Sequence, residues 1–147
     1  MSVMTLEELR ATLPEWQRRL RLQDWTIVVE YVRKSDADGW WGELTIRQLV
    51  HRFAQIRIVD PATWQLEDHP TDEIASDPEY VLVHELVHIY TDGTLGLDDS
   101  AVKINRGSAR NIWAEQSADA IARALIGLKR GDLTVSLEIG SAKLPAD

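Results

Sequence analysis

Two histidines and a glutamate interrupt an otherwise apolar run, 81-VLVHELVHIY-90. If this run is helical, His84 and His88 lie four residues apart on one face, so both imidazoles can reach one point. Glu85 is rotated to the side but stays near that point. Two neutral imidazoles at this spacing are typical zinc ligands, and the adjacent glutamate can act as general base on a water held by the metal. The run therefore predicts a zinc site with Glu85 as its catalytic base.

The alternative interpretation is a core helix whose histidines bond to backbone carbonyl groups and bind no metal. Burying two imidazoles and a carboxylate in apolar surroundings is costly unless each finds a partner. A shuffled chain of this composition would contain the pattern H-E-x-x-H in only roughly 1% of cases. We therefore favour the zinc site over the metal-free core helix.

A catalytic zinc site needs a third protein ligand and an open fourth position. Glu115 is the strongest candidate. On its predicted helix it lies within a largely apolar face, where a carboxylate is unexpected. The other residues of this face are Ile112, Ala118, Asp119, Ala122 and Ile126. A carboxylate in that position needs a partner, which is either a metal ion or an arginine such as Arg106 or Arg110.

Other carboxylates could assist the predicted ligands or replace Glu115 as the third ligand. Asp119, one turn beyond Glu115, is placed to accept a hydrogen bond from the free ring nitrogen of a zinc-bound histidine. Asp98 and Asp99 are weaker ligand candidates, because they fall in a predicted loop close behind the histidines. No histidine follows His88 and the chain has no cysteine, so a downstream imidazole or a thiolate is not available as a ligand.

The N-terminal segment is predicted to be helical. Thr5 and Glu8 have the spacing of a capping box, and a second pattern of the same kind, beginning at Thr12, surrounds Pro14. Because proline interrupts helices, we expect two short helices, or one helix broken near Pro14, ending by about Leu22.

Three strands are expected to follow, over 25–33, 43–49 and 53–60, because these segments are rich in β-branched and aromatic residues. Aspartate–proline pairs beginning at Asp60 and Asp77 are typical of a helix N-cap followed by proline at the first helical position. The second pair begins the helix that carries both histidines.

A long helix over about 108–129 carries the glutamate, and the alternating apolar residues of 132–140 predict a last strand. Strands followed by helices favour an α+β fold. We expect an N-terminal helix, a three-stranded mixed or antiparallel sheet, the histidine helix, the glutamate helix and the C-terminal strand. They form a single domain over 1–147, with a core at about 25–130 and a tail at 131–147.

Composition excludes several classes of protein. The chain has 147 residues, a formal net charge of −8 and no cysteine. The negative charge argues against a nucleic-acid-binding surface. No apolar run approaches the roughly 18 residues that suggest a membrane span, and the first residues lack the pattern of a secretory signal. We therefore expect a cytoplasmic protein without nucleic-acid or membrane partners, and nothing in the sequence indicates its oligomeric state.

The two motifs together, H-E-L-V-H at 84–88 and Glu115 followed by Asp119, resemble those of the gluzincin metallopeptidases. The small size, the strands ahead of a single motif helix and the glutamate helix after it are similar to the minigluzincins and related small phage or bacterial metallopeptidases. This chain has Ala114 where thermolysin-like enzymes usually have asparagine.

The gluzincin resemblance implies a zinc metalloendopeptidase, a hydrolase that acts on a peptide or protein substrate. It implies that Glu115 is the third zinc ligand and that Asp119 orients His84. It also implies an extended substrate along an edge strand, which we place at 53–60 or its neighbour; no individual substrate-binding residue is assigned. Candidates for stabilising the transition state are Tyr80, Tyr90, His51 and His69.

Two other functions compete with the peptidase. One is a catalytically silent zinc-binding module with a regulatory or structural role, which acts through a protein partner. The other is a metal-free binding domain. The peptidase is favoured because Glu85 is unnecessary for either alternative. The tail over 132–140 is expected to pair with the sheet, exchange between subunits or cover the cleft as an inhibitory segment.

Overall fold

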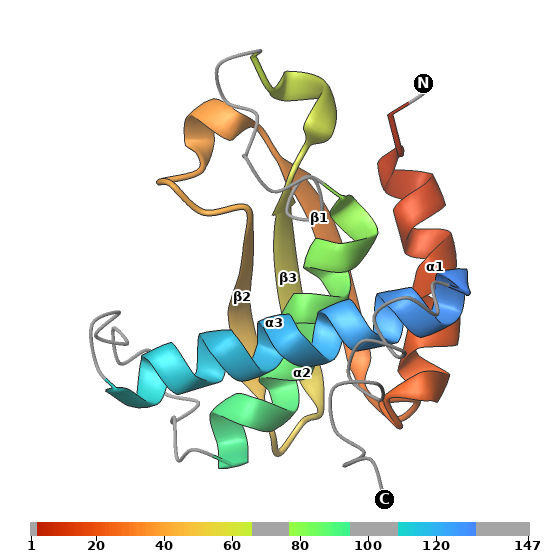
Figure 1. Cartoon of the computed structure of the whole chain (residues 1–147), viewed down its shortest axis with the longest axis vertical. Helices are drawn as coiled ribbons and strands as arrows, with labels where there is room; N and C mark the ends of the chain where they lie inside the picture. The colour runs from red at the N-terminus through yellow and green to blue at the C-terminus, as the bar shows by residue number, and fades with distance from the viewer. Residues whose placement is uncertain (1–2, 66–76, 95–108, 132–147) are drawn as a thin grey trace, which may run out of the picture.

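The computed structural model describes residues 3–65, 77–94 and 109–131 (Figure 1). In chain order the elements are α1 (Leu6–Arg19), β1 (Thr26–Val32), η1 (Lys34–Asp36), β2 (Gly42–Gln48), β3 (Phe53–Val59), η2 (Pro61–Thr63), α2 (Pro78–Thr94) and α3 (Ala109–Arg130); η1 and η2 are short 3₁₀ helices. The predicted α+β fold is confirmed. The last strand, predicted over 132–140, lies outside the described residues.

The three strands form one mixed sheet in the order β1-β3-β2. β1 runs parallel to β3, whereas β2 runs antiparallel to it. Ala54, Ile56 and Ile58 are buried along one face of β3, as their alternation predicts. The gluzincin resemblance led us to expect the substrate-binding edge strand at 53–60 or its neighbour. β3, which spans 53–59, is the central strand of the described sheet and is therefore not an edge. Its neighbour β2 forms one edge of the described sheet.

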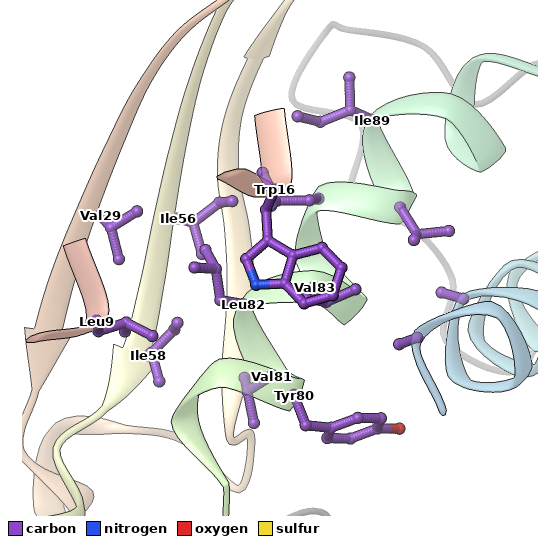
Figure 2. Close-up of a cluster of buried hydrophobic side chains, with 14 of the residues drawn as sticks. Leu9, Trp16, Val29, Ile56, Ile58, Tyr80, Val81, Leu82, Val83 and Ile89 are labelled. Carbon is purple, nitrogen blue, oxygen red and sulfur yellow. The ribbon is translucent and has the colours of Figure 1, made fainter. Parts of the chain in front are cut away.

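α2 lies between the sheet and α3, and this position explains its composition (Figure 1). The helix contacts β2 and β3 through one side, α1 less extensively, and α3 through a long interface. A helix covered on most of its surface must be apolar nearly all round. The buried core around it includes Trp16, Ile56, Leu82 and Val83 (Figure 2).

The predicted break in the N-terminal helix is wrong, because α1 is continuous with Pro14 inside it. Leu9 and Trp16, seven residues apart on one helix face, are both fully buried in the core. Their packing offsets the loss of the backbone hydrogen bond that proline removes. The second capping box does not form, since the Thr12 hydroxyl donates to the Leu9 carbonyl at 2.7 Å within the helix. The first capping box forms as predicted.

The two helices that carry the predicted site begin and end close to where the sequence places them. The Asp77 side chain accepts the backbone N–H of Glu79 at 2.9 Å, so it caps α2 ahead of Pro78. α3 ends at Arg130 and is followed by Gly131 in the left-handed region, with φ at 70°. None of the helices within the described ranges combines the length and apolar character needed to cross a membrane.

Candidate metal centre

α2 holds both histidines at the interface with α3. His88 is buried and His84 is partly buried, and the residues around them (Val83, Leu86 and Val87) belong to the core. The spacing of four residues brings the rings together, with centroids 4.9 Å apart and the two Nε2 atoms 3.1 Å apart. The predicted convergence of the two imidazoles is present.

Glu115 of α3 faces the two histidines, as the sequence predicts. Its Oε2 lies 3.2 Å from Nε2 of His84, and its Oε1 lies 3.1 Å from Nε2 of His88. The Glu115 side chain is 56% exposed, so solvent reaches the carboxylate from outside. Two nitrogens and a carboxylate from two helices therefore meet at one partly open point.

These distances fit a zinc ion. Zinc bonds of about 2.0–2.1 Å in a tetrahedral arrangement place neighbouring ligand atoms about 3.3 Å apart. The two Nε2 atoms lie 3.1 Å apart, and they lie 3.2 and 3.1 Å from two different oxygens of Glu115. With one ligand atom taken from each residue, the three atoms lie within 4.8 Å of one another. His84, His88 and Glu115 form the one group of three such side chains close enough to hold a metal ion within the described part of the chain. Two imidazoles and one carboxylate are a ligand set that zinc accepts, with a fourth position left for water or substrate.

The two histidines also determine the charge state of Glu115. Hydrogen bonds from His84 and then His88 lower the pKa of the Glu115 carboxyl well below its ordinary range, although partial burial acts in the opposite direction. Glu115 is therefore ionised at neutral pH. An ionised carboxylate is the form that binds a cation.

Glu85 is buried, with 6% of its surface exposed, and β2 passes close to it. A Cβ atom added to Gly42, the first residue of β2, would clash with Cγ1 of Val81 and would also lie 3.0 Å from Oε1 of Glu85 and 3.2 Å from its Cγ. Any larger residue would push against Val81 first and crowd Glu85, so the missing side chain of Gly42 lets β2 pack closely on the turn of α2 that carries the predicted base. Sequence analysis did not single out Gly42; a glycine opening a strand was the available signal.

Asp119 lies on α3 one turn beyond Glu115, as predicted, but other partners hold its carboxylate. Oδ1 accepts a hydrogen bond from the Tyr80 hydroxyl, and Oδ2 accepts the Nε–H of Arg123 at 2.9 Å. The Tyr80 ring lies beside the His84 ring, with centroids 6.1 Å apart. A direct contact between Asp119 and His84 stays a prediction, and the role of Tyr80 next to Asp119 was not foreseen.

Of the other candidates named from the sequence, two that the structure describes, Tyr90 and His51, are not part of this group. The Tyr90 hydroxyl donates to the carbonyl groups of Leu20 and Arg21, so it ties α2 to the end of α1. His51 is exposed in the turn between β2 and β3. The remaining candidates fall outside the described side chains: His69, Asp98, Asp99, Arg106 and Arg110.

Comparisons with known proteins add no relative: no protein family, curated protein or solved structure matches this chain. The resemblance to the gluzincins therefore rests on the two motifs alone.

Proposed function

We propose that this protein is a zinc-dependent metallopeptidase. The observation that carries the proposal is the convergence of His84, His88 and Glu115, whose ligand atoms lie within 4.8 Å of one another, close enough to hold one metal ion. The buried position of Glu85 next to the ligand His84 supports a catalytic role for Glu85, because a purely structural zinc site needs no buried carboxylate beside its ligands.

Each residue has a defined task in this proposal. The two imidazoles and the Glu115 carboxylate hold the metal, and the half-exposed position of Glu115 leaves room for substrate. A zinc ion bound there supplies Lewis acidity toward a peptide carbonyl and lowers the pKa of water toward about 7. Glu85 accepts a proton from the attacking water and delivers it to the leaving amine. The partly apolar surroundings of Glu85 limit competition from bulk water.

The edge strand β2 is the proposed peptide-binding strand. It begins at Gly42 against Glu85 and extends toward the C-terminal half of α2, where the Arg47 Nε–H donates to the Ile89 carbonyl at 3.0 Å. An extended peptide that pairs with β2 would pass alongside the metal ligands and bind through main-chain hydrogen bonds. Such binding makes modest demands on substrate sequence. We include a cytoplasmic location in the proposal, because a chain without cysteine gains nothing from an oxidising compartment.

Zinc content measured by mass spectrometry on untagged protein tests the metal site. We expect one zinc per chain in the wild type and loss of zinc in Glu115→Ala. His51→Ala is the matched control for His84→Ala, because His51 is exposed in a turn and belongs to no such ligand group. A wild type that takes up no zinc would make α2 a metal-free core helix and end the proposal.

The second stage separates a peptidase from a silent zinc-binding module. Glu85→Gln keeps the shape of the side chain but removes the base, so it should retain zinc and lose about 10²–10⁴-fold in peptide hydrolysis. Equal zinc content with no hydrolysis in the wild type, across a broad peptide library, would favour the silent module that acts through a protein partner.

A further inference from the structure

The helices α2 and α3 meet through two series of side chains, each spaced by four residues. On α2 the series is Tyr80, His84 and His88; on α3 it is Glu115, Asp119 and Arg123. Each series lies on one face of its helix. The histidines contact Glu115, whereas Tyr80 contacts Asp119. Later residues of α2 thus meet earlier residues of α3, so the two helices run in roughly opposite directions.

The apolar part of this interface gives little control over the axial position of α3. Its buried residues on α3 are mainly small: Ala114, Ala118, Ala122 and Ile126. Alanine side chains make shallow ridges, so sliding one helix along the other meets little steric resistance. One residue of sliding moves a helix by about 1.5 Å, whereas a metal site tolerates deviations of only about 0.2 Å in its bond lengths. The position of Glu115 therefore depends on polar contacts.

Tyr80 makes a polar contact with Asp119 close to the candidate ligands. Asp119 is about 6 Å along the helix from Glu115, whereas Lys129, which contacts α2 at Glu79, is about 21 Å away. Tyr80 is 4% exposed, so its hydroxyl has little water as an alternative partner. The Arg123 guanidinium lies 5.6 Å from the centre of the Tyr80 ring and also binds Asp119, which holds the phenol and the carboxylate together.

We propose that Tyr80 is a positioning residue for the metal site, acting through Asp119 to fix α3 where Glu115 meets His84 and His88. This inference rests on the proposed zinc site. It assigns to Tyr80 no contact with the substrate. The Tyr80 hydroxyl donates a hydrogen bond to Asp119. This contact fixes the position of α3 along α2, and with it the position of the proposed third ligand, Glu115.

The test compares two tyrosine-to-phenylalanine variants. Tyr80→Phe removes the hydroxyl that binds Asp119, and Tyr31→Phe removes a hydroxyl that donates to the Met4 carbonyl at 3.0 Å between β1 and the segment before α1. Zinc affinity is measured by competition with a chelator, and stability of the metal-free proteins by urea unfolding. We expect Tyr80→Phe to weaken zinc binding about tenfold or more and Tyr31→Phe to leave it unchanged, while both variants stay folded.

A double-mutant cycle with Asp119→Asn shows whether Tyr80 acts through Asp119. We expect Tyr80→Phe to cause little further loss of zinc affinity once Asp119 is changed. Wild-type zinc affinity in a folded Tyr80→Phe variant, or an equal loss in both backgrounds, would overturn the inference while leaving the zinc site intact. Absence of zinc binding by the wild type would instead overturn the proposed function, and this inference with it.

Discussion

The interface between α2 and α3 contains a carboxylate near each end, and the two are surrounded differently. Glu79 is 5% exposed and accepts hydrogen bonds from Trp16 at 2.8 Å, Arg130 at 3.3 Å and Lys129. Its negative charge is matched by two cations and an indole N–H. Glu115, at the other end, is half-exposed and faces two imidazoles, neither of which carries a permanent charge.

The difference shows how a structural carboxylate is distinguished from a candidate metal ligand. A buried carboxylate that is stably paired with lysine and arginine has its charge balanced by the protein itself. A carboxylate opposite two imidazoles can offer three electron-pair donors to one point once a cation replaces the ring protons that point at the carboxylate. The Glu79 cluster (Trp16, Glu79, Lys129 and Arg130) therefore joins three helices, whereas the Glu115 end is suited to bind a metal.

Replacing Glu79 should give the largest loss of stability. Glu79→Ala removes the buried acceptor that the cations of α3 share with the indole of α1. Lys129 keeps Glu15 and Arg130 keeps Asp77 as partners, so we expect a loss of about 3 kcal/mol in the free energy of unfolding, mainly from the unpaired buried indole N–H. Urea unfolding of the metal-free protein measures it. Glu15→Ala is the control, because Glu15 also contacts Lys129, at 3.3 Å, but lies at the surface. An equal loss in both variants would contradict the role given to the Glu79 cluster.

Zinc should stabilise the folded protein by binding at the end of the α2–α3 interface where Glu115 lies. At a free zinc concentration one hundred times its Kd, the gain for the wild type is about 2.7 kcal/mol. Glu115→Ala should remove this gain while changing the metal-free protein by less than about 1 kcal/mol, because the side chain is half-exposed. Unfolding with and without zinc measures both quantities. Zinc stabilisation that survives in Glu115→Ala would exclude this residue as a ligand.

Filling the gap at Gly42 should disturb Glu85 without touching the ligands. In Gly42→Ala the new methyl group would clash with Cγ1 of Val81 and lie 3.0 Å from Oε1 of Glu85, so β2 or this turn of α2 must move and Glu85 must shift slightly with it. We expect a loss of about 1–3 kcal/mol in stability, a lower rate of peptide hydrolysis and unchanged zinc stoichiometry. Gly39→Ala is a useful contrast, since its added methyl group meets nothing within 4 Å and only its positive φ of 76° is strained.

The smallest predicted effect is a dependence of stability on pH from Glu79. Burial raises the pKa of this carboxyl, but hydrogen bonds from Lys129, Trp16 and Arg130 outweigh it, so the net pKa lies below the ordinary value of 4.5. The folded state therefore favours the ionised form. The resulting stability is complete well above pH 4.5 and is lost as the pH falls through the lowered pKa.

Unfolding curves of the wild type and Glu79→Gln over the acidic range isolate this contribution. The difference in stability between the two proteins should shrink as the pH falls, because the wild-type carboxyl becomes neutral like the amide. Other carboxylates titrate in both proteins and cancel in the difference. A difference that grows on acidification would show that the pKa of Glu79 is raised.

Local signals in the sequence predicted most of the elements. The cap at Asp77 with Pro78 and the glycine at 131 placed the ends of α2 and α3 because these residues act on the nearest turn of backbone. The break at Pro14 was predicted wrongly, because the burial of Leu9 and Trp16 on the other elements stabilises a helix that local preference would interrupt.

The sequence by itself determined which side chains share a helix face. Helical periodicity requires His84 to lie beside His88, and places Glu115 and Asp119 on one side of α3, wherever these helices lie. It therefore determined which ligand types the candidate site offers, namely two imidazoles and a carboxylate.

Only the tertiary structure decided how those faces meet. Glu115 reaches a histidine 31 residues earlier because α3 packs across α2 through small side chains, and no periodicity within either helix encodes that crossing. The approach of Gly42 to Glu85 and the pairing of Tyr80 with Asp119 likewise join separate elements. Contacts of this kind depend on the packing of the whole core, which is a sum over many residues rather than a property of one segment.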